Sequence, residues 1–554
     1  MNLKSRLFLF LIILLGLFLR IYDLEKVPPS LFSDEVDAAY QALSFNHCHT
    51  DYFGRSIPIH FKSIADYRTA LPILSISLSQ QIFGVNDFSV RFPSVFFGTL
   101  SILIFYFIGK NISKSESSGL ILAFISSVNP WLIHYSRTAF EVSAMLFVIL
   151  ISIYFWLIFL KNQKKRFLIL CLVSLLSSAY IYSTAKLYIF FIGIYYLITS
   201  FKQIIKIQLS KLILIFSILL LLATPLIIST LAGQSGYRFS YISIFADPTI
   251  SDQVDYFRYL DIPQNLRQVG VSTPFFSKLF HNKYLYILNS FTNKYLSSFS
   301  TDFLFNQGDN NLRHGFKLFG YFYKFEFFIL LLGIYQTIKK KSKYNTFFIF
   351  LLLTSPIPFA LTNDSVGPHS TRLILMTIPI LYFLSIGLKL ILKSKFKFLL
   401  IIFYTFSVLN FTNFYFKNYS HLSARAFHTG IKQSIQLQNK YKNSYDKIFV
   451  SQKFEPMLLF YLYYNQYLPN SCNIDNLTTI EFPYITGKSF SNFYIGNIEW
   501  SSVKQITQDQ KILFVVTQEE MEAIKLQINP LSPSIIDETI NFYETEPKFI
   551  LFTI

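Results

Sequence analysis

The chain has 554 residues, of which 52% are hydrophobic, and its mean hydropathy is +0.41. This composition excludes an ordinary soluble protein of the same length and indicates an integral membrane protein. The formal net charge of +18 would suggest a nucleic-acid partner in a soluble protein, but here the cations lie in short loops between apolar runs. They therefore indicate membrane topology, and we expect no nucleic-acid binding.

Apolar segments long enough to cross a bilayer recur along the chain and predict about eleven transmembrane helices. The first is followed by a polar loop without a small-residue cleavage pattern, so we expect it to be retained as a span. The eleven segments are residues 7–22, 90–109, 117–133, 140–160, 167–183, 185–201, 211–230, 319–338, 345–361, 373–392 and 396–416.

The connections between these segments alternate in charge. Lysine and arginine gather at every second connection, which the positive-inside rule assigns to the cytoplasm. The amino terminus is then cytoplasmic, whereas residues 23–89, 231–318 and 417–554 lie on the outer face of the membrane. The basic connections are residues 4–6, 110–114, 161–166, 202–211, 339–343 and 393–397.

Two outer segments predict structure of their own. Residues 72–84 are apolar but too short to span, which favours a helix lying in the membrane interface. After residue 417, strand and helix patterns alternate, as expected for a small α/β domain. The strand patterns are residues 447–451 and 511–516, and the helical run is 456–467.

We therefore predict a mostly α-helical, polytopic membrane protein with a transmembrane domain at 1–416 and an extracytoplasmic α/β domain at 417–554. The three cysteines, Cys48, Cys171 and Cys472, are too few and too scattered to predict a disulfide framework or a zinc site.

An acidic pair, Asp34 and Glu35, lies just beyond the first predicted span and therefore close to the membrane surface. Carboxylates are costly to desolvate there, so their presence indicates a specific role. Asp66 and Arg68 form a second polar group in the same loop. The acidic pair could also cap a helix that begins near Val36. Taken alone, it is explained equally well by capping and by catalysis.

Cations on the predicted outer side supply a second argument. The positive-inside rule disfavours them there unless they have an acidic partner, and a phosphate is one such partner because arginine binds its oxygens through two donors. For any single residue, an ion pair with a neighbouring carboxylate is the more common explanation. The outward cations are Arg68, Arg91, Arg137, Lys186, Arg238, Arg313, His314, His369 and Arg372. All of them except Arg91 and Arg238 are candidates for binding the phosphate.

Several motifs carry a resemblance to a known family over roughly residues 1–420. The chain resembles GT-C superfamily glycosyltransferases of family 39, which are related to dolichyl-phosphate-mannose–protein mannosyltransferases and lipid A aminoarabinose transferases, and most of all their bacterial members. The motifs are DEVDAAYQAL, IFGVNDFSVRFPSVFFG, NPWLIHYSRTAFE, FLFNQGDNNLRHG and PIPFALTNDSVGPHSTR.

The resemblance implies that Asp34 and Glu35 occupy the family's first-loop acidic motif, whose aspartate is taken as the catalytic base. Asp66 and Arg68 match a family acidic–basic pair, although Thr69-Ala70 replaces the prolines that often follow it. The resemblance also implies polyprenyl-phosphate-linked monosaccharide donors and inversion at the anomeric carbon.

The resulting hypothesis is an inverting glycosyltransferase on the outer face of a plasma membrane, with a protein, a glycolipid or a wall polymer as acceptor. Asp34, Glu35 and Asp66 are the predicted catalytic residues, and the candidate cations above are the predicted phosphate ligands. A divalent cation, Mg²⁺ or Mn²⁺, is left open; if one is present, Asp34 or Glu35 would bind it.

Two alternatives stay open. A lipid-linked sugar flippase would bury ionisable groups near the bilayer midplane and often shows paired repeats. A non-catalytic envelope scaffold would use residues 417–554 to bind a partner. Alanine in place of Asp34 separates these readings, because only an enzyme should lose turnover while still being expressed.

Overall fold

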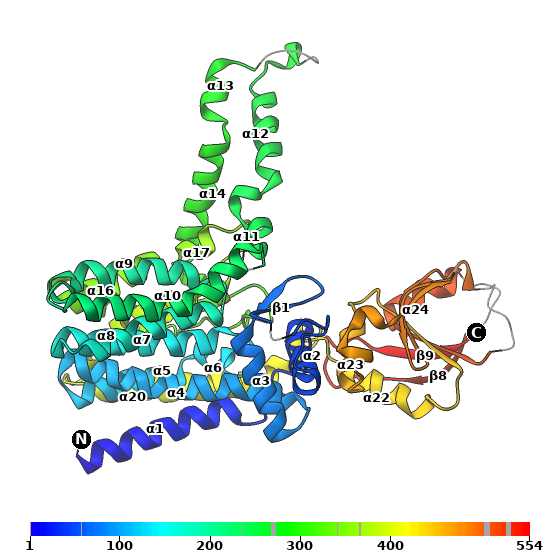
Figure 1. Cartoon of the computed structure of the whole chain (residues 1–554), viewed down its shortest axis with the longest axis horizontal. Helices are drawn as coiled ribbons and strands as arrows, with labels where there is room; N and C mark the ends of the chain where they lie inside the picture. The colour runs from blue at the N-terminus through cyan, green and yellow to red at the C-terminus, as the bar shows by residue number, and fades with distance from the viewer. Residues whose placement is uncertain are drawn as a thin grey trace. The chain divides into compact units, whose positions relative to one another are not determined.

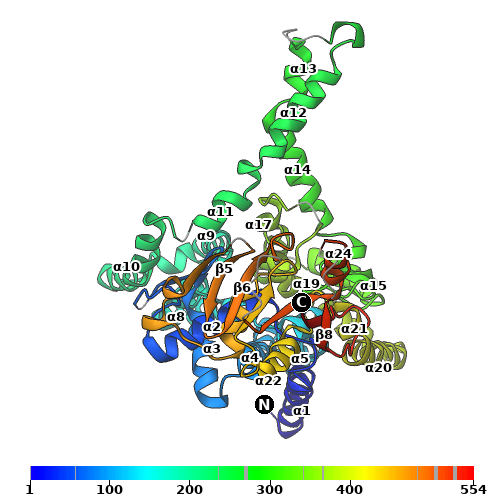
Figure 2. The same ribbon diagram turned by 90° about the vertical axis from the view of Figure 1, so that its right-hand side faces the viewer.

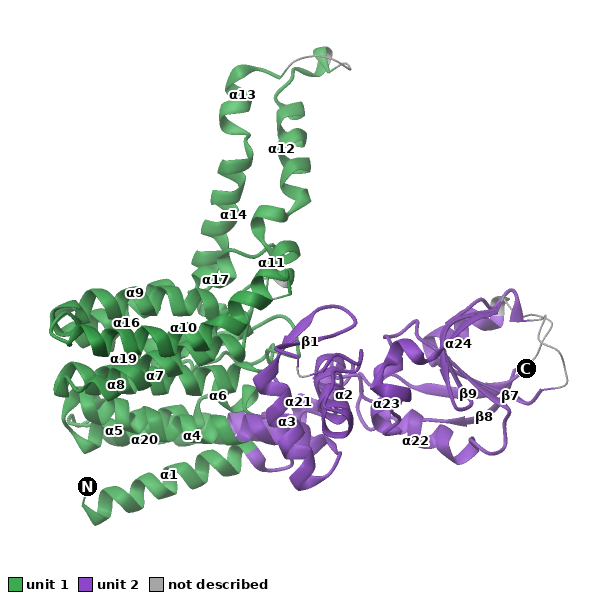
Figure 3. Cartoon of the chain, in the orientation of Figure 1, with its two compact units in different colours: residues 1–20, 96–136, 141–409 green, residues 21–95, 137–140, 410–554 purple. Residues whose placement is uncertain are grey.

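The structure is a computed structural model of the chain (Figure 1). It describes residues 2–56, 58–234, 236–267, 273–340, 342–364, 367–482, 484–503, 510–527 and 533–554. The chain forms two compact units (Figure 3). Unit 1 contains residues 1–20, 96–136 and 141–409, and unit 2 contains residues 21–95, 137–140 and 410–554. The domain boundary expected at residues 416 and 417 stays a prediction.

Unit 1 is helical, and each of the eleven predicted segments contains a helix. Among the described residues, six helical stretches are long and apolar enough to cross a membrane: Asp87–Ser113, Val142–Asn162, Ala185–Ile204, Leu209–Leu231, Ser370–Ile391 and Lys397–Ser423. The membrane character of the chain is therefore confirmed, whereas the count of eleven spans stays a prediction.

The helices that start in unit 1 or run into it are bounded as follows. They are α1 (Leu3–Ile21), α4 (Asp87–Ser113), α5 (Glu116–Val128), α6 (Pro130–Tyr135), α7 (Val142–Asn162), α8 (Lys165–Ser177), α9 (Ala185–Ile204), α10 (Leu209–Leu231), α11 (Tyr237–Ile242), α12 (Pro248–Leu260), α13 (Phe275–Phe280), α14 (Lys283–Ser297), α15 (Glu326–Lys339), α16 (Lys343–Thr354), α17 (Ile357–Ala360), α18 (Ser370–Leu373), α19 (Thr377–Ile391) and α20 (Lys397–Asn413).

Glycines allow two of these helices to pack closely. A Cβ on Gly333 of α15 would collide with the backbone oxygen of Phe383 on α19, and one on Gly387 would collide with the backbone oxygen of Ile329. Small residues of this kind let the backbones of membrane helices approach, where lipid supplies no hydrophobic driving force for association.

Unit 2 begins with the first predicted outer loop, which folds into α2 (Ser33–Cys48), the strands β1 (His60–Lys62) and β2 (Tyr67–Thr69), and α3 (Ala70–Phe83). The helix expected at 72–84 is confirmed as α3, and its place in the interface stays a prediction. Capping is confirmed for Glu35, which accepts from the backbone N–H of Phe32 at 3.3 Å in a capping box, although the helix begins before Val36. The N-cap of α2 is Phe32, so Asp34 and Glu35 lie in the first turn of the helix.

The carboxy-terminal part of unit 2 is an α/β domain around a seven-stranded sheet of order β4-β5-β6-β3-β7-β9-β8. Strand β3 pairs in parallel with β6 and β7, and the other neighbours are antiparallel. The strands are β3 (Lys447–Ser451), β4 (Thr478–Phe482), β5 (Ile485–Phe490), β6 (Phe493–Ile498), β7 (Ile512–Thr517), β8 (Ser534–Glu538) and β9 (Phe549–Thr553); the helices include α22 (Ile431–Tyr441), α23 (Leu458–Tyr464) and α24 (Gln518–Gln527).

The two predicted strands and the predicted helical run are confirmed as β3, β7 and α23. Both faces of β3 are covered: Ile448 and Val450 pack into one apolar cluster and Phe449 into another. Successive side chains of a strand point to opposite faces, so a central strand buried on both sides is apolar throughout.

The first outer loop and the carboxy-terminal domain share a core within unit 2. Val36 and Leu43 of α2 belong to the same buried cluster as Phe460 of α23. A disulfide joins Cys48, at the end of α2, to Cys472. The cysteines thus form a bridge despite their separation in the chain, and Cys171 is buried and free.

Candidate functional site

The exposed carboxylate of the predicted pair belongs to an ion-pair cluster at the start of α2. Arg68 of β2 donates from Nη2 to Oδ1 of Asp34 at 2.7 Å and from Nε to Oδ2 of Asp37. The Asp34 side chain is 55% exposed, whereas that of Asp37 is 5% exposed. Residues three apart share a helix face, which lets one guanidinium bridge both carboxylates. Asp34 is thus oriented and still accessible.

Asp37 is the buried member of this ion-pair cluster and holds Arg68 in place. Its Oδ1 accepts hydrogen bonds from the Tyr52 hydroxyl at 2.6 Å and the Ser63 hydroxyl at 3.1 Å. Burial, together with the Asp37 charge, raises the pKa of Tyr52 well above its usual value, so the hydroxyl keeps its proton. Sequence reasoning missed Asp37, although its spacing of three from Asp34 was a signal.

Glu35 is placed quite differently from Asp34, because both of its oxygens are occupied inside the protein. Arg91 donates to Oε1 at 3.1 Å and to Oε2 at 3.0 Å. The backbone N–H groups of Ala139 and Phe32 donate to the same two oxygens at 2.8 and 3.3 Å. Glu35 and Arg91 are both buried. This geometry favours a structural role for Glu35.

Asp66, the third predicted catalytic residue, lies in the turn between β1 and β2. Its backbone oxygen accepts from the Ser63 N–H at 2.7 Å, and its Oδ1 accepts from the Tyr67 N–H at 2.7 Å. The residue therefore shapes the turn that presents Arg68 on the next strand.

Arg137, also in unit 2, is fully buried. It donates to the backbone oxygens of Val27 and Asp23, and its guanidinium lies 4.8 Å from the centre of the Phe416 ring. Burial lowers its pKa to about 10. These contacts hold the chain after α1 in place, so they favour a structural role over phosphate binding.

A second polar cluster lies in unit 1 around two of the predicted phosphate ligands, His314 and His369. His314 Nδ1 is 3.1 Å from the Tyr135 hydroxyl, and its ring centre is 4.8 Å from that of His369. Arg313 precedes His314 in the chain, and Arg372 follows His369 by one helical turn. Arg372 forms an ion pair with Asp364 at 3.0 Å. We refer to Arg313, His314, His369 and Arg372 as the basic cluster.

Asp309 ties the basic cluster together, and sequence reasoning missed it. Its Oδ2 accepts from the N–H and the hydroxyl of Ser370 at 2.9 and 3.1 Å, and its Oδ1 accepts from the Asn311 N–H at 2.9 Å. Burial raises its pKa from the ordinary value to about 6. The Gly308-Asp309-Asn310 sequence is typical of a turn, which was the only local signal.

Asp309 should make stability depend on pH. Its carboxyl holds a proton in the folded state, but not in the unfolded state, between pH 4 and 6, so stability falls as pH rises through this window. The raised pKa corresponds to a loss of roughly 3 kcal/mol by neutral pH. Asp309→Asn should remove this slope from melting temperatures measured in detergent between pH 4 and 7. An unchanged slope would assign the pH dependence to other groups.

Lys186 lies at the start of α9, two residues before Tyr188, whose hydroxyl donates to the backbone oxygen of Arg372 at 2.5 Å. Lys186 also lines a mainly apolar cavity of about 330 Å³ together with residues of α8 and α10, among them Leu176 and Ala223.

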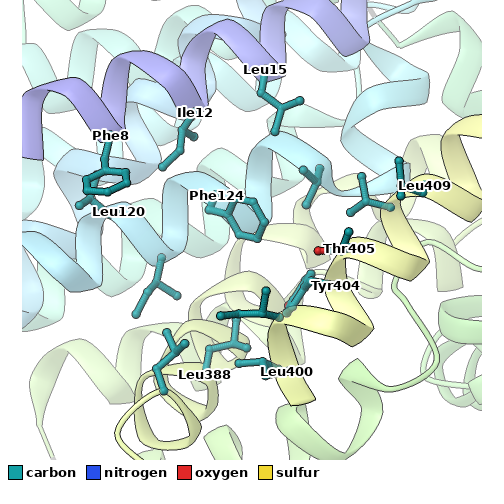
Figure 4. A pocket seen from close by; sticks show the side chains of 15 residues that line it. Phe8, Ile12, Leu15, Leu120, Phe124, Leu388, Leu400, Tyr404, Thr405 and Leu409 are labelled. Atoms are coloured by element: carbon teal, nitrogen blue, oxygen red, sulfur yellow. The ribbon is translucent and has the colours of Figure 1, made fainter. Parts of the chain in front are cut away.

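Two larger cavities of unit 1 differ in character. One, of about 970 Å³, is lined by aromatic, amide and charged side chains of α12 and α14 and by Asp364, the partner of Arg372. The other, of about 520 Å³, is an apolar groove among α1, α5, α19 and α20 (Figure 4). Phe8, Phe124 and Leu400 line this groove, so its chemistry suits a hydrocarbon chain.

The carboxylates proposed for a divalent cation do not form a metal site. Glu35 uses both oxygens within the protein, and Arg68 already places a positive charge beside Asp34. Within the described ranges, no three or more His, Cys, Asp or Glu residues gather in a way that could hold an ion. We therefore derive no step through a metal.

The fold and the two polar clusters define a polytopic membrane protein with an accessible, cation-bound carboxylate in the first turn of α2. Residues 70–228 match the model of a family described as dolichyl-phosphate-mannose-protein mannosyltransferase. This match confirms the resemblance to GT-C glycosyltransferases.

Among solved structures, the chain aligns with ArnT from Cupriavidus metallidurans bound to undecaprenyl phosphate, at 9% identity and a TM-score of 0.49. The alignment covers 99% of this chain and 98% of that chain. Another aligned structure is AglB, the archaeal oligosaccharyltransferase from Archaeoglobus fulgidus in complex with an inhibitory peptide and a dolichol-phosphate, at 11% identity and a TM-score of 0.47. That alignment covers 86% of this chain and 65% of AglB, so the chain spans just under two thirds of the archaeal protein. No curated protein matches the chain in sequence.

Proposed function

We propose that the protein is an inverting glycosyltransferase that moves a monosaccharide from a polyprenyl-phosphate donor to an acceptor hydroxyl at the outer membrane face. The observation that carries the proposal is Asp34, an exposed carboxylate held in one orientation by Arg68, which Asp37 in turn fixes. The match of residues 70–228 to a family named for a lipid-phosphate sugar donor supports the donor class.

In the proposed reaction, Asp34 accepts the proton of the acceptor hydroxyl as its oxygen attacks C1 of the donor sugar. The bond from C1 to the phosphate oxygen breaks, and the lipid phosphate leaves with the bonding electrons on the face opposite to the attack. The anomeric configuration is therefore inverted. A sugar or serine hydroxyl is a weak nucleophile, so a positioned base is needed.

The leaving phosphate gains negative charge in this step, and preorganised cations lower the barrier to its departure. The basic cluster of unit 1 is the proposed phosphate site. Arginine suits the role because its planar fork can meet two phosphate oxygens at once. Asp309 is the proposed positioning residue, since it clamps Ser370, two residues before Arg372.

The polar cavity of about 970 Å³ is the proposed site for the sugar-bearing part of a substrate. Amide groups of Asn289 and Asn293 and the aromatic rings of Tyr256 and Tyr286 line it. Pockets that fix a ligand commonly combine such apolar surfaces with a few convergent polar groups.

The proposed orientation puts unit 2 outside the cytoplasm. The charge alternation of the loops supports it. The disulfide between Cys48 and Cys472 supports it independently, because disulfides persist in oxidising compartments and are rare in the cytosol. Both cysteines fall in segments that the charge pattern assigns to the outer side.

The test is transfer in sealed membrane vesicles of known orientation, supplied from outside with a panel of polyprenyl-phosphate sugars. Right-side-out vesicles should form product with one donor, and inside-out vesicles should not. In the same assay Arg372→Lys should raise the donor concentration needed for half-maximal rate, because lysine lacks the two-donor fork. Equal activity in both orientations would contradict the sidedness, and a complete lack of transfer across the panel would favour a flippase or a scaffold.

A further inference from the structure

The long loop after α10 forms a helical extension of unit 1, made of α11, α12, α13 and α14. In Figures 1 and 2 the pair of α12 and α14 runs crosswise to the long helices of the bundle, such as α9 and α10. Helices that span a membrane lie along its normal, give or take a moderate tilt. A segment that runs crosswise to them therefore runs along the plane of the membrane.

The extension is attached to the bundle at helix ends. It begins six residues after α10, one of the candidate spans, stops. At its other end, the Lys294 ammonium donates to the backbone oxygen of Thr362 at 2.6 Å, and the Tyr295 hydroxyl donates to that of Leu353 at 2.8 Å. These contacts place α14 at the level where the bundle helices end, which is the level of the membrane surface.

The most exposed large apolar side chains of the extension lie on α13 and α14, whereas those of α12, such as Tyr256 at 58% and Tyr259 at 50%, are less exposed. On α13, Phe275 is 76% exposed and Phe276 is 70% exposed. On α14, Tyr284 is 84% exposed, and Leu288 and Leu296 lie four and twelve residues further on. At about 3.6 residues per turn, the three fall within roughly a third of the helix circumference. An apolar surface of this kind facing water would be a liability and marks an interaction site.

Charge divides the extension in the same way. The helices α13 and α14 contain three lysines, Lys278, Lys283 and Lys294, and no acidic residue. The acidic residues lie instead on α12 and at its ends, at Asp247, Asp252, Asp255 and Asp261. In Figure 1 the bundle helices extend to the left. Helix α14 lies on this left side of the extension, and α12 lies on its right side.

We infer that α13 and the outward face of α14 are embedded in the interface of the membrane that the bundle spans, with α12 on the water side. Amphipathic helices with aromatic and leucine side chains on one face and lysines at its border bind in this way, and the lysines attract anionic lipid headgroups. The opposite face of α14, with Asn289 and Asn293, lines the polar cavity. A substrate in that cavity would then sit at headgroup level. The inference about the membrane does not depend on the proposed function.

The test uses the full-length protein reconstituted in vesicles of phosphatidylcholine and phosphatidylglycerol. In a Cys171→Ser background that keeps the Cys48–Cys472 bridge, single cysteines replace Phe276 or Tyr284, and matched controls replace Asp252 or Asp255 on α12. Each is labelled with a nitroxide, and its collisions with oxygen, which concentrates in lipid, are compared with those of a water-soluble nickel chelate.

Labels at 276 and 284 should favour oxygen, and labels at 252 and 255 should favour the nickel chelate. Lys278→Glu combined with Lys283→Glu should reduce the oxygen preference at 276, and replacing phosphatidylglycerol by phosphatidylcholine should reduce it in the same direction. If all four labels meet the nickel chelate equally, the surface is not in the membrane, and a protein partner becomes its occupant. That outcome would overturn the inference and leave the proposed transfer reaction untouched.

Discussion

Replacing Asp34 by alanine should lower the rate of sugar transfer by on the order of 10²–10⁴-fold, which is the usual effect of losing a general base. The side chain is exposed and lies on the helix surface, so the fold should survive the change. Asp34→Asn should lose nearly as much activity, because the amide keeps the size of the side chain but cannot accept the proton.

The measurement is the initial rate of product formation with the donor identified in vesicles, together with the melting temperature of each variant. Asp475→Ala, another exposed carboxylate of unit 2, is the matched control and should leave both quantities unchanged. Wild-type transfer by Asp34→Ala would remove Asp34 from the mechanism.

Replacing Glu35 by alanine should act on stability instead. Arg91 would keep its contacts to the backbone oxygens of Leu24, Pro28 and Ser30. It would lose the carboxylate with which it forms an ion pair, while staying buried. Breaking a buried ion pair from one side typically costs about 3–5 kcal/mol, because an uncompensated charge remains. The Ala139 N–H would also lose its acceptor.

Thermal or denaturant unfolding in detergent measures this effect, with Glu481→Ala as an exposed control on β4 that should be neutral. Any folded Glu35→Ala protein should retain more transfer activity per molecule than Asp34→Ala. A stable Glu35→Ala variant with abolished transfer would reverse these assignments and place Glu35 in the catalytic step.

Asp34 and Glu35 show what a sequence motif can predict and what it cannot. Their position after the first span and the family resemblance marked both as candidates for catalysis. Their different environments depend on partners that are distant in the chain: Arg68 for Asp34, and Arg91 with Ala139 for Glu35. Asp37 escaped notice for the same reason, since nothing in the local pattern indicates Tyr52 and Ser63 as its donors.

For the basic cluster too, the sequence predicted the candidate residues, whereas their contacts depend on the fold. The outward cations were predicted from charge pattern alone. Only the fold brings His314 beside His369, although the two lie 55 residues apart in the chain. Asp309, which holds the cluster together, looked like an ordinary turn residue in the sequence.

By itself the sequence determined the features that depend on local hydropathy and periodicity. These are the membrane character, the helices in the eleven apolar segments, the apolar helix α3, and the elements β3, α23 and β7 of the carboxy-terminal domain. Apolar stretches of sufficient length must leave water, and side-chain periods of 2 or 3.6 distinguish strand from helix wherever they bury a face.

Tertiary structure alone decided which distant segments meet. It joined residues 21–95 to the carboxy-terminal domain through a common core and the Cys48–Cys472 bridge, and it placed α12 to α14 crosswise to the bundle. Such contacts are selected by the packing and pairing of side chains hundreds of residues apart. No local pattern encodes them, because burial and partner choice are properties of the assembled core and not of any one segment.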